Sequence, residues 1–222
     1  MIHLLSVDST NDYILREDYP SGTVIWADSQ TAGRGRGDHR FASPEGGIYF
    51  SCLLKDLSFE EALLLTPKAA VAVCMALEDI CGLSPRIKWV NDVLLEGKKV
   101  CGILCEHYED RYVAGIGINI NGNDLPGDLR GIAAGIGDGL SAEIPKEKII
   151  VRISDILLSP MSADTVREEY GRRLSVAGRY VSFTYDGKEK TGVAAGINEN
   201  CNLLVDTPEG RIALSSGEIT LL

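Results

Sequence analysis

A short segment rich in glycine and arginine is the part of the sequence best suited to binding an anion. Residues 33–40 contain three glycines and three arginines. Glycine lets backbone N–H groups approach an anion closely, and arginine adds planar, often bidentate, charged contacts. We therefore predict a phosphate-binding loop here. A solvated basic loop and an RGG-like nucleic-acid segment are the alternatives that composition alone leaves open.

A second candidate is the lysine of the Lys88-Trp89-Val90-Asn91-Asp92 segment, which follows a short apolar run. At a strand end its ammonium would be half buried and close to an anion bound against the sheet. The alternative is a surface lysine whose stem covers apolar neighbours. The usual nucleotide signatures are missing, because there is no GxxxxGK[ST] and residues 115–119 lack the third glycine and following helix of a dinucleotide turn.

The overall charge limits what these residues can bind. The net charge of −10 disfavours nucleic acid, so anion binding must depend on the local basic cluster. The first residues do not resemble a signal peptide, and no apolar run approaches the roughly 18 residues that span a bilayer. We expect a cytoplasmic protein that binds neither DNA nor membranes.

The six cysteines show no CxxC pair and no regular spacing, so we expect them to be reduced and mostly buried. Cys101, Cys105 and His107 alternate along one predicted strand and so share a face with Ile103. That pattern indicates core packing. Metal ligation is the alternative.

The N-terminal half of the chain must position these segments. Strands are predicted over residues 2–7, 22–27 and 47–54, and a helix is predicted to begin at Ser9. Ser58 and Glu61 have the spacing of a capping box. The alanine- and leucine-rich run up to Cys81 is predicted to be the main core helix, with Thr66 as a possible cap before Pro67.

The pattern then changes to an antiparallel meander over residues 93–95, 99–107 and 112–120, followed by helices over residues 145–158 and 163–174. After Gly178, short strands and turns indicate a small β-barrel. Without steady β-α-β alternation, the fold class is α+β with a mixed or antiparallel sheet. The predicted division is 1–176 and 177–222.

Several segments together resemble the biotin protein ligase family, in order and approximate spacing, over nearly the whole chain. These segments are Ser9-Thr10-Asn11, Gln30 with Gly33-Arg34-Gly35-Arg36, Lys88-Trp89-x-Asn91-Asp92, Gly102-Ile103-Leu104-x-Glu106, Gly115-Ile116-Gly117-Ile118-Asn119 and the C-terminal residues 178–219. The pairing of GRGR with KWxND at this separation is highly specific.

The resemblance implies a catalytic domain related to class II aminoacyl-tRNA synthetases and a C-terminal SH3-like barrel. It also implies ATP, Mg²⁺ and biotin as ligands and a reaction in two steps. Biotin and ATP would first form biotinyl-AMP, and a lysine of a biotin carboxyl carrier protein or domain of a biotin-dependent carboxylase would then accept the biotin. The arginines and Lys88 would stabilise the charge that builds on the phosphate.

Site residues follow from the same resemblance. Lys88 and Arg36 are the predicted catalytic residues. The predicted biotin site contains Ser9, Thr10, Asn11, Gln30, Arg34, Gly35, Arg36, Lys88 and Gly102. The predicted ATP or adenylate site contains Gly33, Arg34, Arg36, Arg40 and Asn119. Asp92 is predicted to lie near Mg²⁺.

The sequence departs from the family pattern in two places. The family commonly has GRGRxGRxW, whereas Arg36 is followed here by Gly37-Asp38-His39-Arg40-Phe41, which leaves the anion contacts after Arg36 open. The usual proline of KWPND is Val90, which removes a fixed φ but no chemical group.

Since the Ser9 segment lies so close to the start, no helix-turn-helix is expected before it. A homodimer is possible. Competing interpretations are a lipoate or octanoyl transferase and a non-catalytic biotin sensor or nucleic-acid-binding module.

Overall fold

A seven-stranded mixed sheet forms the centre of the protein. The computed structural model describes residues 1–129, 131–140 and 143–222. The strands are β1 (Ile2–Leu4), β2 (Val24–Ala27), β3 (Ile48–Lys55), β4 (Arg86–Lys88), β5 (Asp92–Leu95), β6 (Lys98–Tyr108) and β7 (Arg111–Ile118). Their order is β1-β2-β3-β7-β6-β5-β4, with β1 parallel to β2 and the other neighbours antiparallel. The predicted meander is confirmed.

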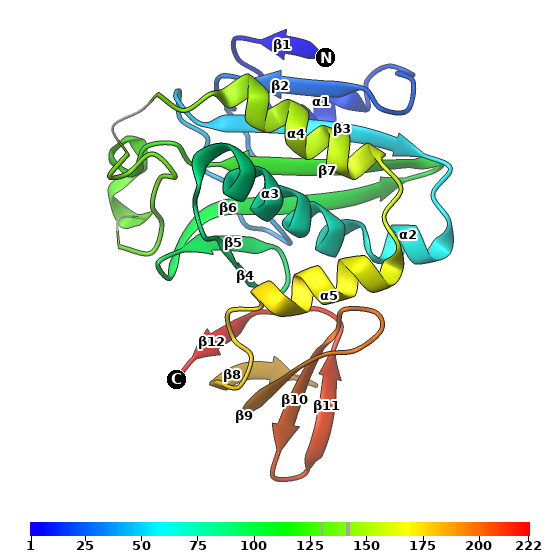
Figure 1. Cartoon of the computed structure of the whole chain (residues 1–222), viewed down its shortest axis with the longest axis vertical. Coiled ribbons are helices and arrows are strands. Elements are labelled where there is room, and N and C mark those ends of the chain that lie inside the picture. The colour runs from blue at the N-terminus through cyan, green and yellow to red at the C-terminus, as the bar shows by residue number, and fades with distance from the viewer. Residues whose placement is uncertain (130, 141–142) are drawn as a thin grey trace.

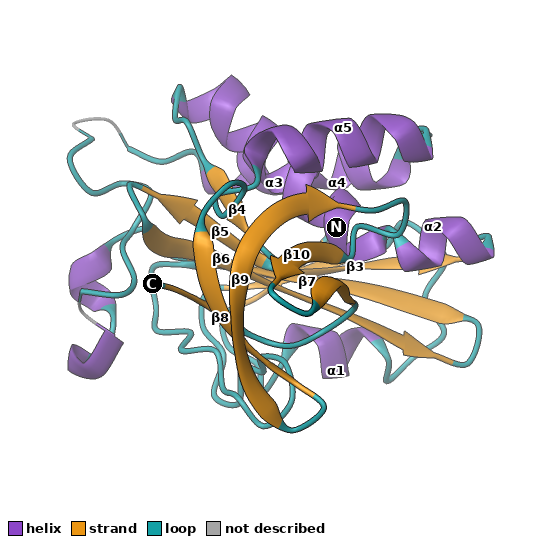
Figure 2. Cartoon of the chain, turned by 90° about the horizontal axis from the view of Figure 1, so that it is seen from below, coloured by secondary structure: helices purple, strands orange, loops and turns teal. Residues whose placement is uncertain are grey.

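Helices lie on both faces of this sheet (Figures 1 and 2). They are α1 (Thr10–Ile14), α2 (Phe59–Leu63), α3 (Leu65–Cys81), α4 (Lys146–Leu158) and α5 (Ala163–Arg173). Helices α3, α4 and α5 lie on one side, and α1 lies on the other (Figure 2). Two short 3-10 turns, η1 (Gly122–Asp124) and η2 (Gly127–Leu129), follow β7. The face that carries α1 is therefore the less covered one.

Local capping explains most helix starts. The Ser9 side chain accepts a hydrogen bond from the Asp12 N–H and caps α1, and the predicted box of Ser58 and Glu61 caps α2. The prediction that Thr66 caps the core helix is wrong. Helix α3 begins at Leu65, inside the turn that continues from α2, and has no side-chain cap.

A second, strongly curved sheet forms the C-terminal part of the chain (Figure 2). It contains β8 (Tyr180–Tyr185), β9 (Lys188–Ile197), β10 (Leu203–Thr207), β11 (Gly210–Leu214) and β12 (Ile219–Leu221). All pairs are antiparallel, in the order β11-β10-β9-β8-β12. Its buried side chains join the same core cluster as α3 and α5, so the two sheets are packed together.

Candidate functional site

A cavity of about 290 Å³ lies on the α1 side of the main sheet and brings most of the predicted residues together. Its walls come from the start of α1, the loop of residues 30–41, strands β4 to β7 and the segment before β12. The predicted residues that line it are Ser9, Thr10, Asn11, Gln30, Arg34, Gly35, Arg36, Arg40, Lys88, Asp92 and Gly102. Gly33 and Asn119 do not line it.

The arginine and glycine segment is folded as a tight turn and not as an open loop. The Phe41 N–H donates to the Gly33 carbonyl at 3.0 Å, and the Gly35 N–H donates to the His39 carbonyl at 2.8 Å. Gly37 has a φ of 58° at the tip of the turn, a conformation that favours glycine. The turn itself therefore uses the N–H group of Gly35, although this glycine still lines the cavity.

One end of the cavity is a buried network of short polar side chains. Thr10 and Asn11 are only 3% and 5% exposed. The Thr10 N–H donates to Gln30 Oε1 at 2.9 Å, and Gln30 Nε2 donates to Ser43 Oγ at 2.9 Å. The fully buried Ser51 Oγ lies 2.8 Å from Thr10 Oγ1 and 2.5 Å from Asn11 Oδ1. These contacts fix the orientation of each donor and acceptor.

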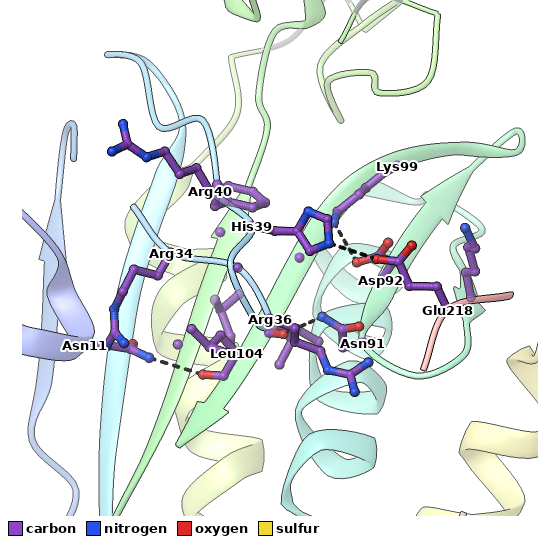
Figure 3. A pocket seen from close by; sticks show the side chains of 18 of the residues that line it. Asn11, Arg34, Arg36, His39, Arg40, Asn91, Asp92, Lys99, Leu104 and Glu218 are labelled. Carbon is purple, nitrogen blue, oxygen red and sulfur yellow. Dashed lines mark hydrogen bonds and ion pairs between the residues drawn. The ribbon is translucent and has the colours of Figure 1, made fainter. Parts of the chain in front are cut away.

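Glu106 extends this network to the arginine turn. Its carboxylate accepts from Asn11 Nδ2 at 2.8 Å and from the Arg34 guanidinium at 2.9 and 2.7 Å. Arg34 also contacts Asp12 at 2.6 Å. Figure 3 shows the Arg34 side chain extending toward Asn11. With two carboxylates around it, Arg34 is poorly placed to attract a further anion, and the geometry favours a contribution to the polar end of the cavity.

Glycines form the floor of the cavity because larger residues would collide with the side chains above them. Gly102 pairs with Gly117 across β6 and β7. A Cβ atom at these positions would lie 2.7 and 2.4 Å from carbon atoms of the Phe41 ring. A Cβ at Gly115 would lie 2.2 Å from Asn11 Oδ1. The glycines therefore let Phe41 and Asn11 rest directly on the sheet.

The opposite end of the cavity carries most of the unneutralised positive charge. Lys88 is half-buried on β4 and has no hydrogen-bond or ion-pair partner among residues 1–129, 131–140 and 143–222. Arg36 Nη1 contacts the Gly217 carbonyl at 3.4 Å. Lys99 pairs with Asp92 at 2.7 Å, and His39 lies 3.2 Å from Glu218 (Figure 3). Lys88 and Arg36 are therefore placed to attract an anion at this end of the cavity.

Of the remaining predicted ATP-site residues, Arg40 lines the edge of the cavity, whereas Gly33 and Asn119 do not line it. Arg40 is exposed at the edge of the cavity and projects away from His39 and Lys99 (Figure 3). Gly33 is buried behind the turn, where a Cβ would lie 2.5 Å from the Phe41 carbonyl oxygen, so its role in the described structure is to let the turn close. Asn119 is 5% exposed, and its Oδ1 has no hydrogen-bond partner in the part of the chain that is described.

The cysteines lie mostly in the core, as their spacing predicted. Cys101 and Cys105 pack into the main cluster, whereas His107 is exposed and stacks on Tyr112 with ring centroids 4.4 Å apart. Burial raises the pKa of the Cys105 thiol to about 12. Among the residues that are described, no helix is long and apolar enough to cross a membrane.

Sequence reasoning missed several residues of the cavity. Phe41, His39 and Lys99 line it, as do Gly217, Glu218 and Ile219 from the C-terminal sheet. Ser51 does not line the cavity, but its hydroxyl is hydrogen-bonded to Thr10 and Asn11, which do. The one polar residue within the apolar run of residues 48–54 was a usable signal for Ser51. His39 and Phe41 lie in or next to the predicted loop, whereas Lys99 and the C-terminal residues had no local signal, since only the packing of distant segments brings them to the site.

Comparison with known proteins supports a specific family. A model described as the biotin/lipoate A/B protein ligase family matches residues 4–123, and one described as the biotin protein ligase C-terminal domain matches residues 176–222. The bifunctional ligase/repressor BirA of Bacillus subtilis is 34% identical, over 98% of this chain and 72% of its own. The biotin--[acetyl-CoA-carboxylase] ligase of Paracoccus denitrificans is 28% identical, over 97% of this chain and 98% of its own.

Solved structures give a similar result. The biotin protein ligase from Aquifex aeolicus in complex with biotin and ATP superposes with a TM-score of 0.87 at 29% identity. The alignment covers 100% of this chain and 97% of that one. The similarity therefore includes both sheets.

Proposed function

Because the chain belongs to the biotin/lipoate A/B protein ligase family, we propose that it is an ATP-dependent biotin protein ligase. It forms biotinyl-5′-AMP from biotin and ATP, and it then transfers biotin to a lysine of a biotin carboxyl carrier protein or domain. The relatives named biotin--[acetyl-CoA-carboxylase] ligase support this acceptor. The second family match and the separate C-terminal sheet support a division into residues 1–176 and 177–222.

The observation that carries the proposal is the joining of a fixed polar network and a cationic cluster in one cavity. A urea ring has donors and acceptors in fixed directions and loses binding energy when any is left unpaired. Ser9, Thr10, Asn11 and Gln30 offer such directional groups in the lining of the cavity. A carboxylate at the end of the biotin chain would then reach toward Lys88 and Arg36.

In the first step, formation of biotinyl-AMP, negative charge builds up next to the Lys88 and Arg36 cations. A biotin carboxylate oxygen attacks the α-phosphorus of ATP, the bond to pyrophosphate breaks, and negative charge builds on the phosphate oxygens. Lys88 and Arg36 stabilise that charge in a partly dehydrated site. In the second step the lysine nitrogen attacks the acyl carbon and loses a proton. AMP leaves with the electron pair of the C–O bond while the same cations hold it.

Asn119 is proposed to meet the adenine. Its buried Oδ1 is an acceptor without a partner among the described residues, which is costly unless a ligand donates to it. The exocyclic amine of adenine is such a donor.

Mg²⁺ would enter with ATP. Within the described residues, no three His, Cys, Asp or Glu side chains gather as a metal site, and Asp92, which pairs with Lys99 at 2.7 Å, is the proposed carboxylate. Mg²⁺ is commonly held by one or two carboxylates together with substrate phosphates, and Asp92 beside the cationic cluster fits that arrangement. When bound, the ion would neutralise charge on the departing pyrophosphate.

A lipoate ligase is the second candidate, since the matched family includes lipoate enzymes. The C-terminal match to a biotin protein ligase domain and the network around Asn11 favour biotin. A dithiolane ring has no N–H or C=O groups to pair with these side chains.

Composition and charge bear on where the protein acts and what it binds. Six free cysteines support a reducing, cytoplasmic location, and the net charge of −10 supports the absence of DNA binding. Homodimer formation stays a prediction.

Pyrophosphate exchange tests the proposal. We expect exchange into ATP that requires biotin and is not supported by lipoate, followed by labelling of a purified apo biotin carboxyl carrier domain. Exchange with lipoate alone would establish the second candidate instead, and biotin binding without exchange would indicate a sensor.

A further inference from the structure

A second cavity, of about 340 Å³, adjoins the site. It shares Arg36, Asn91, Ile103 and Leu104 with the first cavity, so these four residues form a common wall. The second cavity opens between the start of α3 and the loop of the C-terminal sheet that joins β9 to β10. It therefore reaches the cationic end of the site from a different direction.

The loop that borders this cavity is attached to the catalytic segment. Trp89, the residue that follows Lys88 in the chain, donates a hydrogen bond from Nε1 to the Cys201 carbonyl at 3.0 Å. Asn198 holds the loop, because its Oδ1 accepts from the N–H groups of Asn200 and Asn202 at 3.0 and 2.9 Å. The side chains of Asn200 and Asn202 line the cavity and take no part in these bonds.

The chemistry of the lining suits a neutral polar chain. Leu63, Pro67, Val90 and Leu104 supply apolar surface, and Asn200, Asn202 and Ser215 supply polar groups near the C-terminal sheet. Arg36 is the only charged side chain among the described residues that line it. None of the described residues that line the cavity carries a carboxylate that would stabilise an ammonium group.

The first cavity leaves little room for a third reactant. At its polar end Thr10 and Asn11 are at most 5% exposed and already hydrogen-bonded to Gln30 and Ser51, and Phe41 covers the glycine floor. The cationic end must hold the phosphate of the adenylate. An acceptor amine therefore needs another approach to the acyl carbon that lies near Arg36.

We propose that the second cavity admits the side chain of the acceptor lysine, so that the carrier protein docks over the C-terminal sheet loop and the start of α3. This inference rests on the proposed ligase function. The amine must lose its proton to act as a nucleophile, and the apolar walls and the Arg36 cation both disfavour an ammonium. Its nitrogen then bonds to the acyl carbon, AMP departs with the C–O electron pair, and the second amine proton leaves.

Blocking the cavity tests the proposal, because the two half-reactions can be measured separately. Asn202→Trp fills the cavity from the C-terminal side without removing the Asn198 bonds. We expect biotin-dependent pyrophosphate exchange within about twofold of wild type, and transfer from biotinyl-AMP to an apo carrier domain at least about tenfold slower. Asn202→Ser is the matched control and should transfer at the wild-type rate.

A second variant guards against misfolding. Leu63→Trp blocks the opposite wall from an exposed position of α2 and should show the same separation of the half-reactions. Transfer at the wild-type rate in both folded tryptophan variants would overturn the proposal, as would an equal loss of exchange and transfer. Wild-type protein without any biotin-dependent exchange would overturn the ligase function itself.

Discussion

The Arg34 guanidinium faces both carboxylate oxygens of Glu106, at 2.9 and 2.7 Å, while the same carboxylate accepts from Asn11 at 2.8 Å. One acidic side chain thus connects the arginine turn to the buried network at the polar end of the cavity. Arg34 and Glu106 are best understood as a pair that fixes Asn11, which leaves Arg36 and Lys88 as the cations proposed to act on the phosphate.

Removing this pair should weaken biotin binding more than ATP binding. Glu106→Ala leaves Asn11 Nδ2 with the Leu104 carbonyl at 3.3 Å as its remaining described acceptor. Loss of one charged hydrogen-bond partner costs about 1.5–3 kcal/mol, or roughly 10- to 100-fold in affinity. Isothermal titration with biotin measures this. Glu189→Gln, on an exposed position of β9, is the control. Tighter ATP binding by Glu106→Ala would show instead that Glu106 restrains an anion-binding Arg34.

Removing the Lys88 ammonium should slow adenylation with little loss of stability. Lys88 has no partner in the described structure, so Lys88→Ala breaks no hydrogen bond or ion pair of the fold. We expect exchange to fall by two or more orders of magnitude, about 3 kcal/mol. The matched control is Lys98→Ala, on an exposed position of β6. A folded Lys88→Ala protein with nearly full exchange activity would remove Lys88 from the mechanism.

The glycine floor should tolerate no added methyl group under Phe41. In Gly117→Ala the new Cβ would lie 2.4 Å from a ring carbon, so Phe41 must move and the cavity must change shape. We expect the affinity for biotin to fall at least about tenfold. Adding Phe41→Leu to the same protein should relieve the collision and restore part of that affinity. Gly127→Ala, where a Cβ meets nothing within 4 Å, is the control. If the double variant Gly117→Ala/Phe41→Leu bound biotin no more tightly than Gly117→Ala, this account would be contradicted.

The buried cysteines should make the fold less stable at alkaline pH. Burial raises the pKa of Cys74 to about 12, above the ordinary 9.0 of an unfolded thiol. The folded state therefore retains a proton that the unfolded state loses, and the free energy of unfolding falls as pH rises from about 9 toward 12. Each such thiol contributes a slope of about 1.4 kcal/mol per pH unit in this window.

Urea unfolding between pH 8 and pH 11 measures this effect. Cys74→Ala should be less stable at pH 8 because of the altered core, but it should lose less stability as the pH rises. The exposed substitution Ser84→Ala should leave the slope unchanged. Equal slopes for Cys74→Ala and wild type would contradict the raised pKa.

Local patterns in the sequence determined the elements and indicated two parts of the candidate site, the arginine and glycine segment and Lys88. The capping signals at Ser9 and Ser58 depend on neighbours within one helical turn, and the alternation along residues 99–120 depends on which face of a strand is buried. For that reason the α+β class and the meander could be predicted from local patterns, whereas the predicted roles of Ser9, Thr10, Asn11 and Gln30 followed from the family resemblance. The incorrect prediction that Thr66 caps α3 also came from a local pattern. The helix begins instead at Leu65, because the turn at the end of α2 continues into it.

Only the tertiary structure decided which residues act together. Glu106 meets Asn11 across 95 positions and Arg36 meets Gly217 across 181, because sheet register and the packing of the second sheet bring them together. The same packing set Arg34 between two carboxylates, took Gly33 and Asn119 out of the lining and created the second cavity. Hydrogen bonds and ion pairs between distant segments depend on distances of a few ångströms, and a pattern of residue types along the chain does not contain those distances.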